Sequence, residues 1–370
     1  MHWSKSIDQD AAFPKSFISL DDIHTHVCML MLDIINATPF SQEKTVQYNE
    51  HGEHIWVVGI KGTYQVNPDG TLELSKQQEA ICAYPEYFGD AGKSTLKRDA
   101  ELVLYHPGTD IIVNGTAHAP RGEPAKMVDV GVSVGPVRRV FRVFGERRWE
   151  SGLFGLNMSP PKPFTCLPID YEHAYGGKIS DNNIFTANPI GQGFADKKEA
   201  LKDACLPQVE DPLHFIDAWT DKPAPAGFSA IPSQWTPRKE LAGTVDAKWK
   251  KSRAPLLPED FDPKFFNSTT PDMRTEKPLT GGEEVLLWNL TPREKISFNL
   301  PKVFFNVRSK IRGQLVRNAV QLDRVILEPD ESRLVMVWRT TVNMGRDVRR
   351  LEHTYIDTKI DVKTGKRYGA

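Results

Sequence analysis

The residues best suited to chemistry lie close together in residues 163–194, which read PFTCLPIDYEHAYGG and then, after a short polar loop, NPIGQGF. Asp170, Glu172 and His173 follow one another closely, and carboxylates beside an imidazole can tune its pKa for acid–base catalysis. In an extended segment, however, Asp170 and Glu172 share one face and His173 takes the other. We therefore expect these side chains to form hydrogen bonds and stabilise a turn. The alternative is a hydrolase-like enzyme that uses the Asp170/Glu172/His173 region.

The same stretch contains a thiol and a glycine loop. Cys166 is a candidate nucleophile only if a base lies near it, and its neighbours Phe164 and Leu167 predict a buried, inert thiol. The chain lacks the Gly-x-Ser-x-Gly motif of hydrolases. The NPIGQGF segment is only superficially like a phosphate loop, because no Gly-Lys-Ser/Thr follows it. Its glycines predict close backbone packing or positive φ.

Two pairs of histidines are candidate metal ligands. His24 and His26 lie on one face if extended, but two imidazoles do not make a metal site. His51 and His54 would face opposite sides of a strand, and the helical His-Glu-x-x-His pattern is absent. We expect no metal, no cofactor and no catalytic residue.

Basic residues cluster locally, although 47 Lys and Arg against 48 Asp and Glu leave a net charge of −1. One cluster comprises Arg138, Arg139, Arg142, Arg147 and Arg148. These arginines could contact phosphates of a nucleic acid. A simpler explanation is a β-ribbon in which side chains alternate, so that apolar residues pack inward and the arginines lie on the solvated face. A second cluster, of three lysines and Arg253 around Trp249, predicts a solvated helix face able to meet an acidic partner. The balanced charge favours neither nucleic acid nor membrane as a partner.

Length and composition favour a cytoplasmic protein of two or three packed units. The chain has 370 residues, 39% of them hydrophobic, which is ordinary for a soluble protein. Its N-terminus lacks an apolar signal region, and no run approaches the roughly 18 apolar residues of a membrane span. The four cysteines are scattered and form no Cys-x-x-Cys pair, which argues against a zinc knuckle and a disulfide framework. Reduced thiols in a cytoplasm are therefore expected.

Turn-bounded apolar segments predict a mainly β fold in which antiparallel strands dominate. The clearest hairpin joins His54–Val66 to residues 71–74 through Asn-Pro-Asp-Gly, and Met127–Val134 with Val137–Phe144 predict another. Further strands are expected at residues 23–35, at 110–117 and in five segments between 284 and 341. Residues 347–362 are ambiguous between a helix and an edge strand.

Proline is concentrated in the middle of the chain and rules out long helices and central strands there. Helical patterns occur only at residues 195–204 and near Ala247–Ser252. We therefore expect an N-terminal antiparallel β block (1–155), a loop layer rich in proline and aromatic residues with short helices (156–280), and a C-terminal β block with a tail (281–370). The two β blocks predict a sandwich or open-barrel-like architecture.

The aromatic residues of the centre are the predicted partner-binding surface. Large rings bring apolar area at low entropy cost, and the prolines between them stiffen the backbone. Most such rings are expected in the core, and one or two exposed anchors would suffice. The set is Trp219, Phe228, Trp235, Trp249, Phe265 and Phe266.

An ordered series of short blocks closely resembles the DUF2169 family over roughly residues 36 to 300. The blocks are NATPF (36–40), WVV (56–58), HPGTD (106–110) with AHAP (117–120), GERRW (145–149), YEHAYGG (171–177), NPIGQGF (188–194), PAPAGF (223–228), Trp235 with Arg238, and LPEDFD (257–262) with FFN (265–267). The motif residues to which we assign a structural role are Tyr171, Glu172, His173, Gly176, Gly177, Asn188, Pro189, Gly191 and Gly193.

The resemblance implies an adaptor, or chaperone, of bacterial type VI secretion, which binds a cognate toxic effector and helps load it onto the spike protein. It implies no catalytic residue. Besides the enzyme, a second alternative is a structural component of the secretion apparatus.

Overall fold

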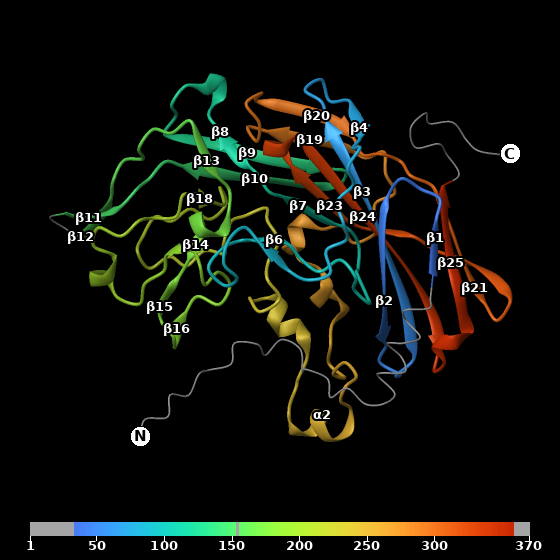
Figure 1. Cartoon of the computed structure of the whole chain (residues 1–370). Helices are drawn as coiled ribbons and strands as arrows, with labels where there is room; N and C mark the ends of the chain where they lie inside the picture. Colours follow the sequence, from blue (N-terminus) through green and yellow to red (C-terminus); the bar gives the residue numbers. More distant parts are fainter. Residues whose placement is uncertain (1–32, 153–154, 359–370) are drawn as a thin grey trace, which may run out of the picture.

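A computed structural model describes residues 33–152 and 155–358, which form three larger β-sheets (Figure 1). The six-stranded sheet consists of β2 (Ser41–Tyr48), β3 (His54–Val66), β24 (Arg333–Gly345), β23 (Gln321–Glu328) and β7 (Asp110–Val113), with β4 (Leu72–Leu74) paired to β3. The five-stranded sheet has the order β18 (Val209–Glu210), β10 (Val137–Phe144), β9 (Met127–Val134), β19 (Glu284–Trp288) and β20 (Lys295–Asn299). The four-stranded sheet has the order β1 (Asp33–Asn36), β25 (Leu351–Thr358), β21 (Phe305–Ile311) and β22 (Gln314–Asn318).

Short ribbons and turns make up the rest of the described chain. The two-stranded ribbons are β5 (Glu86–Tyr87) with β6 (Leu96–Arg98), β8 (Thr116–His118) with β13 (Cys166–Pro168), β11 (Trp149–Gly152) with β12 (Gly155–Met158), β14 (Tyr175–Gly176) with β17 (Gln192–Gly193), and β15 (Lys178–Ser180) with β16 (Asn183–Ile184). Apart from 3-10 turns, the helix in these residues is α2 (Ala247–Ser252). Strand accounts for 42% and helix for 10%, so the mainly β prediction is confirmed. No helix of the described part is long and apolar enough to cross a membrane.

The strands of the two predicted β blocks are interleaved in shared sheets. β23 and β24, from the C-terminal block, lie beside β3 and β7 of the N-terminal block, and β19 pairs with β9 in the five-stranded sheet. Most pairings are antiparallel, but β7 with β23, β1 with β25 and β14 with β17 are parallel. Both long hairpins form as predicted, because local turn residues join strands that are adjacent in sequence.

Three expectations about individual strands need correction. Residues 110–117 form two strands, β7 and β8, that belong to different sheets. The ambiguous tail contains β25, which lies between β1 and β21 and is therefore not an edge strand. Of the predicted strand at residues 23–35, only the part from Asp33 onward lies within the described residues, and it is half-exposed.

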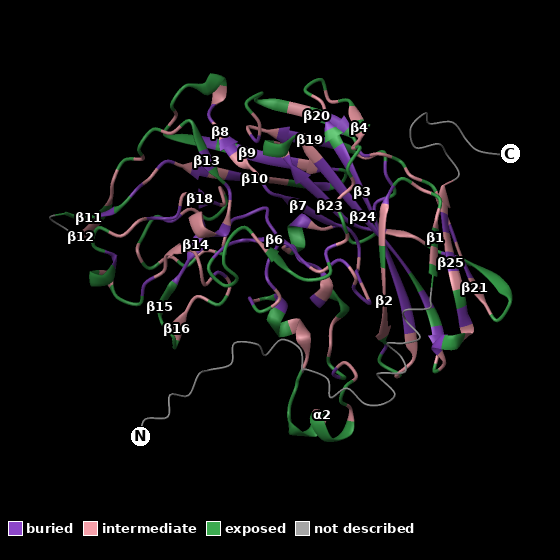
Figure 2. Ribbon diagram, viewed as in Figure 1, coloured by how far each residue is buried: buried purple, intermediate pink, exposed green. Residues whose placement is uncertain are grey.

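The two faces of β3 have different surroundings, although both are buried (Figure 2). Trp56, Val58 and Ile60 point into a hydrophobic core shared by the three sheets. The alternate side chains, among them Val57 and Lys61, point to the opposite face, because successive residues of a strand alternate. Loops from residues 76–105 and from the proline-rich centre cover that second face. The six-stranded sheet is thus a middle layer.

Buried charged residues line the second face and hold the loop layer on it. Lys61 Nζ lies 2.9 Å from Glu101 Oε1, and both side chains are almost fully buried. Arg324 donates to the carbonyl of Asp99 at 2.8 Å, and the Asp99 carboxylate lies 2.8 Å from Arg238 of the proline-rich centre. Removing one member of such a pair leaves an uncompensated buried charge, which is costly. The centre is therefore an ordered layer linked to the sheet through Asp99, which pairs with Arg238 and accepts from Arg324 of β23.

Candidate functional site

The acid–imidazole cluster of the central segment folds as a 3-10 turn. Asp170 precedes the turn Tyr171–His173, and its Oδ1 accepts a hydrogen bond from the backbone N–H of His173 at 3.0 Å. The same oxygen lies 2.5 Å from His173 Nδ1, and this hydrogen bond raises the pKa of His173 against the opposing effect of burial. The segment is a turn and not extended, so Asp170 and His173 lie on the same side, and Asp170 forms hydrogen bonds within the turn, as expected for this cluster.

Glu172 is engaged with a different partner. Its carboxylate accepts hydrogen bonds from the backbone N–H of Thr95, at 3.0 Å, and from the Thr95 hydroxyl. Thr95 Oγ1 in turn accepts the backbone N–H of Tyr171 at 2.8 Å. These bonds attach the turn to the loop that leads into β6. Glu172 and Asp170 thus take separate partners, and the structural role of these motif residues stays a prediction.

The glycines of the central segment allow close approach of two backbones. Strands β14 and β17 pair in parallel, and Asn188 Nδ2 donates to the carbonyls of Tyr171 at 2.7 Å and Tyr175 at 3.1 Å. In the NPIGQGF loop, Gly193 has φ +92°, and a Cβ on Gly191 would lie 2.5 Å from the Ala174 carbonyl oxygen. The close packing predicted for these glycines is confirmed.

Cys166 is exposed, so the prediction of a buried thiol is wrong. In the ribbon β8–β13 the alternation of side chains buries Leu167 and turns Cys166 outward. Its Sγ lies 3.4 Å from His118 Nδ1, and these two residues are 48 positions apart in sequence. Sequence reasoning missed His118 because only strand pairing brings it to Cys166.

The candidate metal ligands do not form a cluster in the described residues. His24 and His26 lie outside them. His51 is exposed, with Nε2 3.7 Å from Glu50, and His54 Nδ1 lies 3.2 Å from the carbonyl oxygen of Gly345. No group of three or more potential ligands is found in the part of the chain that the structure covers.

Arginines of the first basic cluster are occupied by ion pairs. Four of them pair with carboxylates at contact distance: Arg139 with Asp211 and Asp272, Arg142 with Asp129, Arg147 with Glu210, and Arg148 with Glu146. Phosphate binding would have to displace these partners, so the cluster is better suited to holding strands and loops together.

The predicted partner-binding aromatics divide into two groups. Phe228, Trp235 and Phe265 are 1%, 3% and 8% exposed and belong to the core. Trp219, Trp249 and Phe266 are partly exposed. Trp219 packs against a separate core cluster with Trp149, whereas Trp249 lies on α2. Only Trp219, Trp249 and Phe266 are exposed enough to act as surface anchors. Their role in binding stays a prediction.

Helix α2 sits on a loop that projects from the sheets, at the bottom of Figure 1; we call residues 243–261 the α2 arm. Asp246 caps the helix by accepting the backbone N–H of Trp249 at 2.7 Å, and Trp249 Nε1 donates to the carbonyl of Leu256 at 2.9 Å. Asp260 closes the base of the arm through two hydrogen bonds from Thr244.

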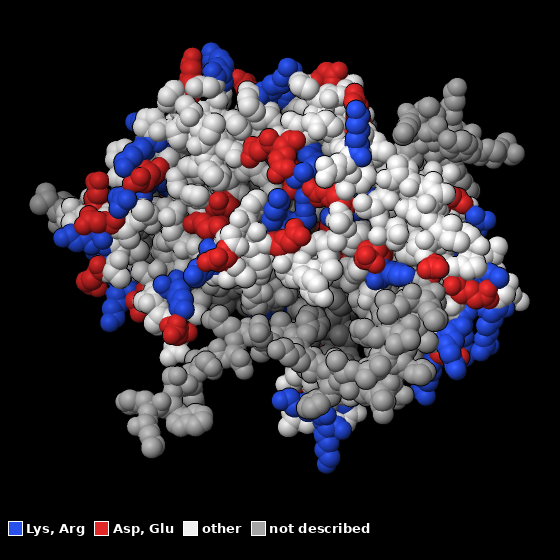
Figure 3. All heavy atoms as spheres, viewed as in Figure 1, with Lys and Arg blue, Asp and Glu red and all other residues white. Residues whose placement is uncertain are grey.

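The α2 arm presents positive charge beside an apolar ring. Lysine and arginine side chains gather at its tip (Figure 3), where Lys248, Lys250 and Lys251 surround Trp249. One side of Trp249 lines a cleft of about 250 Å³ whose other walls include Arg253 and Glu259. The helix and its solvated basic face agree with the sequence prediction.

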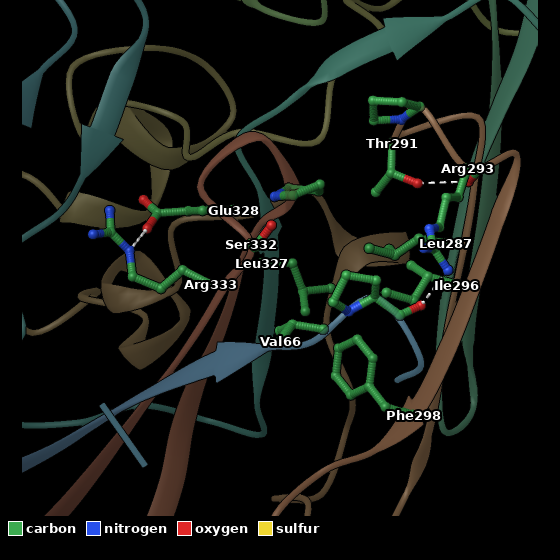
Figure 4. Close-up of a pocket in the computed structure, with 13 residues that line it drawn as sticks. Val66, Leu287, Thr291, Arg293, Ile296, Phe298, Leu327, Glu328, Ser332 and Arg333 are labelled. Atoms are coloured by element: carbon green, nitrogen blue, oxygen red, sulfur yellow. Dashed lines mark hydrogen bonds and ion pairs between the residues drawn. The ribbon is translucent and has the colours of Figure 1, made fainter. Parts of the chain in front are cut away.

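A second concavity lies between the six-stranded and five-stranded sheets. Val66, Leu287 and Phe298 line a pocket of about 200 Å³ (Figure 4). At its rim Glu328 and Arg333 are paired with each other at 2.6 Å. Such a pocket fits an apolar group, and its lining is not arranged for acid–base chemistry.

The Asp170–His173 pair predicts pH-dependent stability. The folded pKa of His173 is raised, so the pair stabilises the protein fully below the ordinary value of 6.5, and this contribution is lost as the pH rises through the folded pKa. His173→Gln should therefore lower the free energy of unfolding by about 1 kcal/mol at pH 5 and by less at pH 9. Urea titrations at both pH values measure this.

Asp170→Asn is the matched control, because it keeps an oxygen for the backbone N–H of His173 and removes the charge. It should abolish the same pH dependence. A cost of His173→Gln that is equal at both pH values would contradict the assignment.

Fold and site together define a class: a β-sheet scaffold that carries an ordered loop layer with a projecting basic arm. The family model described as "Uncharacterized protein conserved in bacteria (DUF2169)" matches residues 51–339, well over half of the chain. The chain belongs to the DUF2169 family. Comparisons with curated proteins and with solved structures each found no match.

Proposed function

We propose that this protein is a non-enzymatic, cytoplasmic adaptor that binds a cognate effector of bacterial type VI secretion and helps load it onto the spike protein. Two features support the proposal: membership of the DUF2169 family, a resemblance that implies such an adaptor, and a surface suited to protein contact.

The α2 arm is the observation that carries the proposal. It projects from the sheets, its hydrogen bonds fix its shape, and it presents a partly exposed tryptophan among cations. A pre-ordered loop loses less conformational entropy on binding than a flexible one. Tryptophan is also enriched among the residues that dominate interface energies. The three lysines of α2 fit an acidic patch on the effector.

Trp249→Ala is therefore expected to weaken effector capture. Truncating a central aromatic anchor costs about 2 kcal/mol or more, which corresponds to an affinity loss of roughly 30-fold. The measurement is co-purification of the tagged protein with the effector and spike encoded beside it, followed by titration of the purified effector.

The matched control is Tyr84→Ala, because Tyr84 is an exposed aromatic ring outside residues 243–261, and this variant should leave capture unchanged. Both variants must retain the parental melting temperature. If Trp249→Ala and the further variants Trp219→Ala and Phe266→Ala all bind like the parent, the contact surface lies elsewhere. If the protein is found in a fixed stoichiometry in the purified, assembled secretion apparatus, it is a structural component of that apparatus and not an adaptor.

A further inference from the structure

Cys166 and His118 face each other across the ribbon β8–β13. They are directly paired in its register, and Cys166 Sγ lies 3.4 Å from His118 Nδ1. The thiol is exposed, whereas the imidazole is 17% exposed and largely covered. A thiol beside an imidazole nitrogen can transfer its proton to that nitrogen, which makes the sulfur nucleophilic.

Asp330 holds the other side of the imidazole. Its Oδ1 lies 3.6 Å from His118 Nε2, a buried nitrogen with no hydrogen-bond partner. Its Oδ2 accepts a hydrogen bond from Thr116 Oγ1 at 2.8 Å, which fixes the carboxylate. A negative charge beside Nε2 favours the tautomer with the proton on that nitrogen, so Nδ1 is free to accept the thiol proton. Nucleophile, base and orienting carboxylate therefore come from three separate segments.

A cavity of about 330 Å³ adjoins this group. Thr116 and Pro168 line it, and they form the next cross-strand pair on the same face of the ribbon as Cys166 and His118. Its lining includes five carboxylates and no lysine or arginine: Asp170, Glu172, Glu328, Asp330 and Glu331. From outside the lining, Arg98 and Arg333 pair with Glu328, Arg333 also pairs with Glu331, and His173 pairs with Asp170. Glu172 and Asp330 have no lysine or arginine partner among the ion pairs of the described residues, so the lining keeps a net negative charge. This cavity favours a positively charged occupant.

We propose that Cys166 is a covalent modification site that accepts the acyl group of a positively charged ester or thioester held in this cavity. The thiol proton passes to His118 Nδ1, and the sulfur attacks the acyl carbon. The bond from that carbon to the leaving oxygen or sulfur breaks, and the leaving group takes the proton back from His118. The products are a thioester on Cys166 and a free alcohol or thiol. The site is independent of the adaptor function.

The test uses the full chain and a cationic acyl donor, p-nitrophenyl 4-guanidinobenzoate. Peptide mapping by mass spectrometry follows acylation of each cysteine over time. Cys166 should react faster than Cys205, the partly exposed thiol that serves as an internal control in the same molecule. Equal rates at the two cysteines would overturn the proposal without any variant being needed.

Variants then test the roles of the two partners. General-base assistance contributes 100-fold or more, so His118→Gln should slow Cys166 by about 100-fold and leave Cys205 unchanged. Asp330→Asn should slow Cys166 as well, and Asp330→Glu should restore part of the rate, because a positioning carboxylate is replaceable by another. A folded His118→Gln variant that is acylated at the parental rate would rule out the base.

Reagent charge tests the part played by the cavity. The matched anionic donor is the p-nitrophenyl ester of 4-carboxybenzoate, which should acylate Cys166 more slowly than the cationic ester. Cys205 pairs with Arg148 and should show no preference for the cationic ester. The same preference at both cysteines, or none at either, would contradict a cationic substrate.

Discussion

Replacing Asp110 with alanine is expected to destabilise the protein by about 3–5 kcal/mol, because it removes a fully buried carboxylate that several donors share. Its oxygens accept hydrogen bonds from Asn267 Nδ2 at 2.9 Å, from the backbone N–H of Ser268 at 2.6 Å and from Thr269 Oγ1 at 2.9 Å. His106 Nε2 lies 3.3 Å away. Alanine would leave these polar groups buried without an acceptor.

The ionisation of Asp110 agrees with this role. Burial by itself would raise the pKa, but the attraction of His106 and Arg324 and the hydrogen bond from the Ser268 N–H hold the pKa of Asp110 well below its ordinary value of 3.8. A lowered folded pKa contributes stability above the unfolded value, and this contribution is lost only as the pH falls through the folded pKa. The effect of Asp110→Ala should therefore be undiminished at neutral pH.

Urea denaturation at pH 7 measures the loss. Asp110→Asn keeps the shape and one acceptor oxygen, so it should cost less than alanine. Asp90→Ala is the surface control: the Asp90 side chain is 79% exposed, and its contact with Lys93 at 3.5 Å should contribute less than about 1 kcal/mol. If Asp110→Ala is as mild as Asp90→Ala, the hydrogen-bonded cluster does not hold the loop layer.

Gly108→Ala is expected to be the other large effect, because two separate costs add at this position. Gly108 has φ +68°, where an L-residue is strained by about 1–2 kcal/mol. A Cβ there would lie 1.8 Å from the carbonyl oxygen of Thr275. Thr275 cannot retreat freely, because hydrogen bonds of 2.9 Å join it to Thr109 in both directions. Forced displacement in a packed interior costs about 1–3 kcal/mol more.

Gly92 provides a matched control for this prediction. Its φ is +77°, yet nothing lies within 4 Å of a Cβ built on it. Gly92→Ala should therefore show the backbone strain alone, and the difference between the two variants in urea denaturation should measure the clash with Thr275. Equal losses would mean that the chain around Thr275 adjusts without cost.

Sequence by itself determined the features that depend on neighbouring residues. The Asn-Pro-Asp-Gly turn and the alternating apolar residues around it specify the hairpin of β3 and β4, and Gly135-Pro136 does the same for β9 and β10. The polar, lysine-rich segment at Ala247–Ser252 identifies α2. These predictions succeeded because a turn or a cap is decided within a few residues.

Only the tertiary structure decided which distant segments meet, and the candidate sites depend on those meetings. Asp110 and Asn267 are 157 positions apart, and their contact exists because the loop layer covers the second face of the six-stranded sheet. The loop layer also covers Lys61, which is therefore buried and paired with Glu101 and is not a surface lysine. For Cys166, apolar neighbours predicted burial, but pairing with β8 set which side of the strand faces solvent and placed His118 beside the thiol. In a strand, neighbouring side chains always point to opposite faces. Which of the two faces is buried depends on how the sheet packs against the rest of the protein.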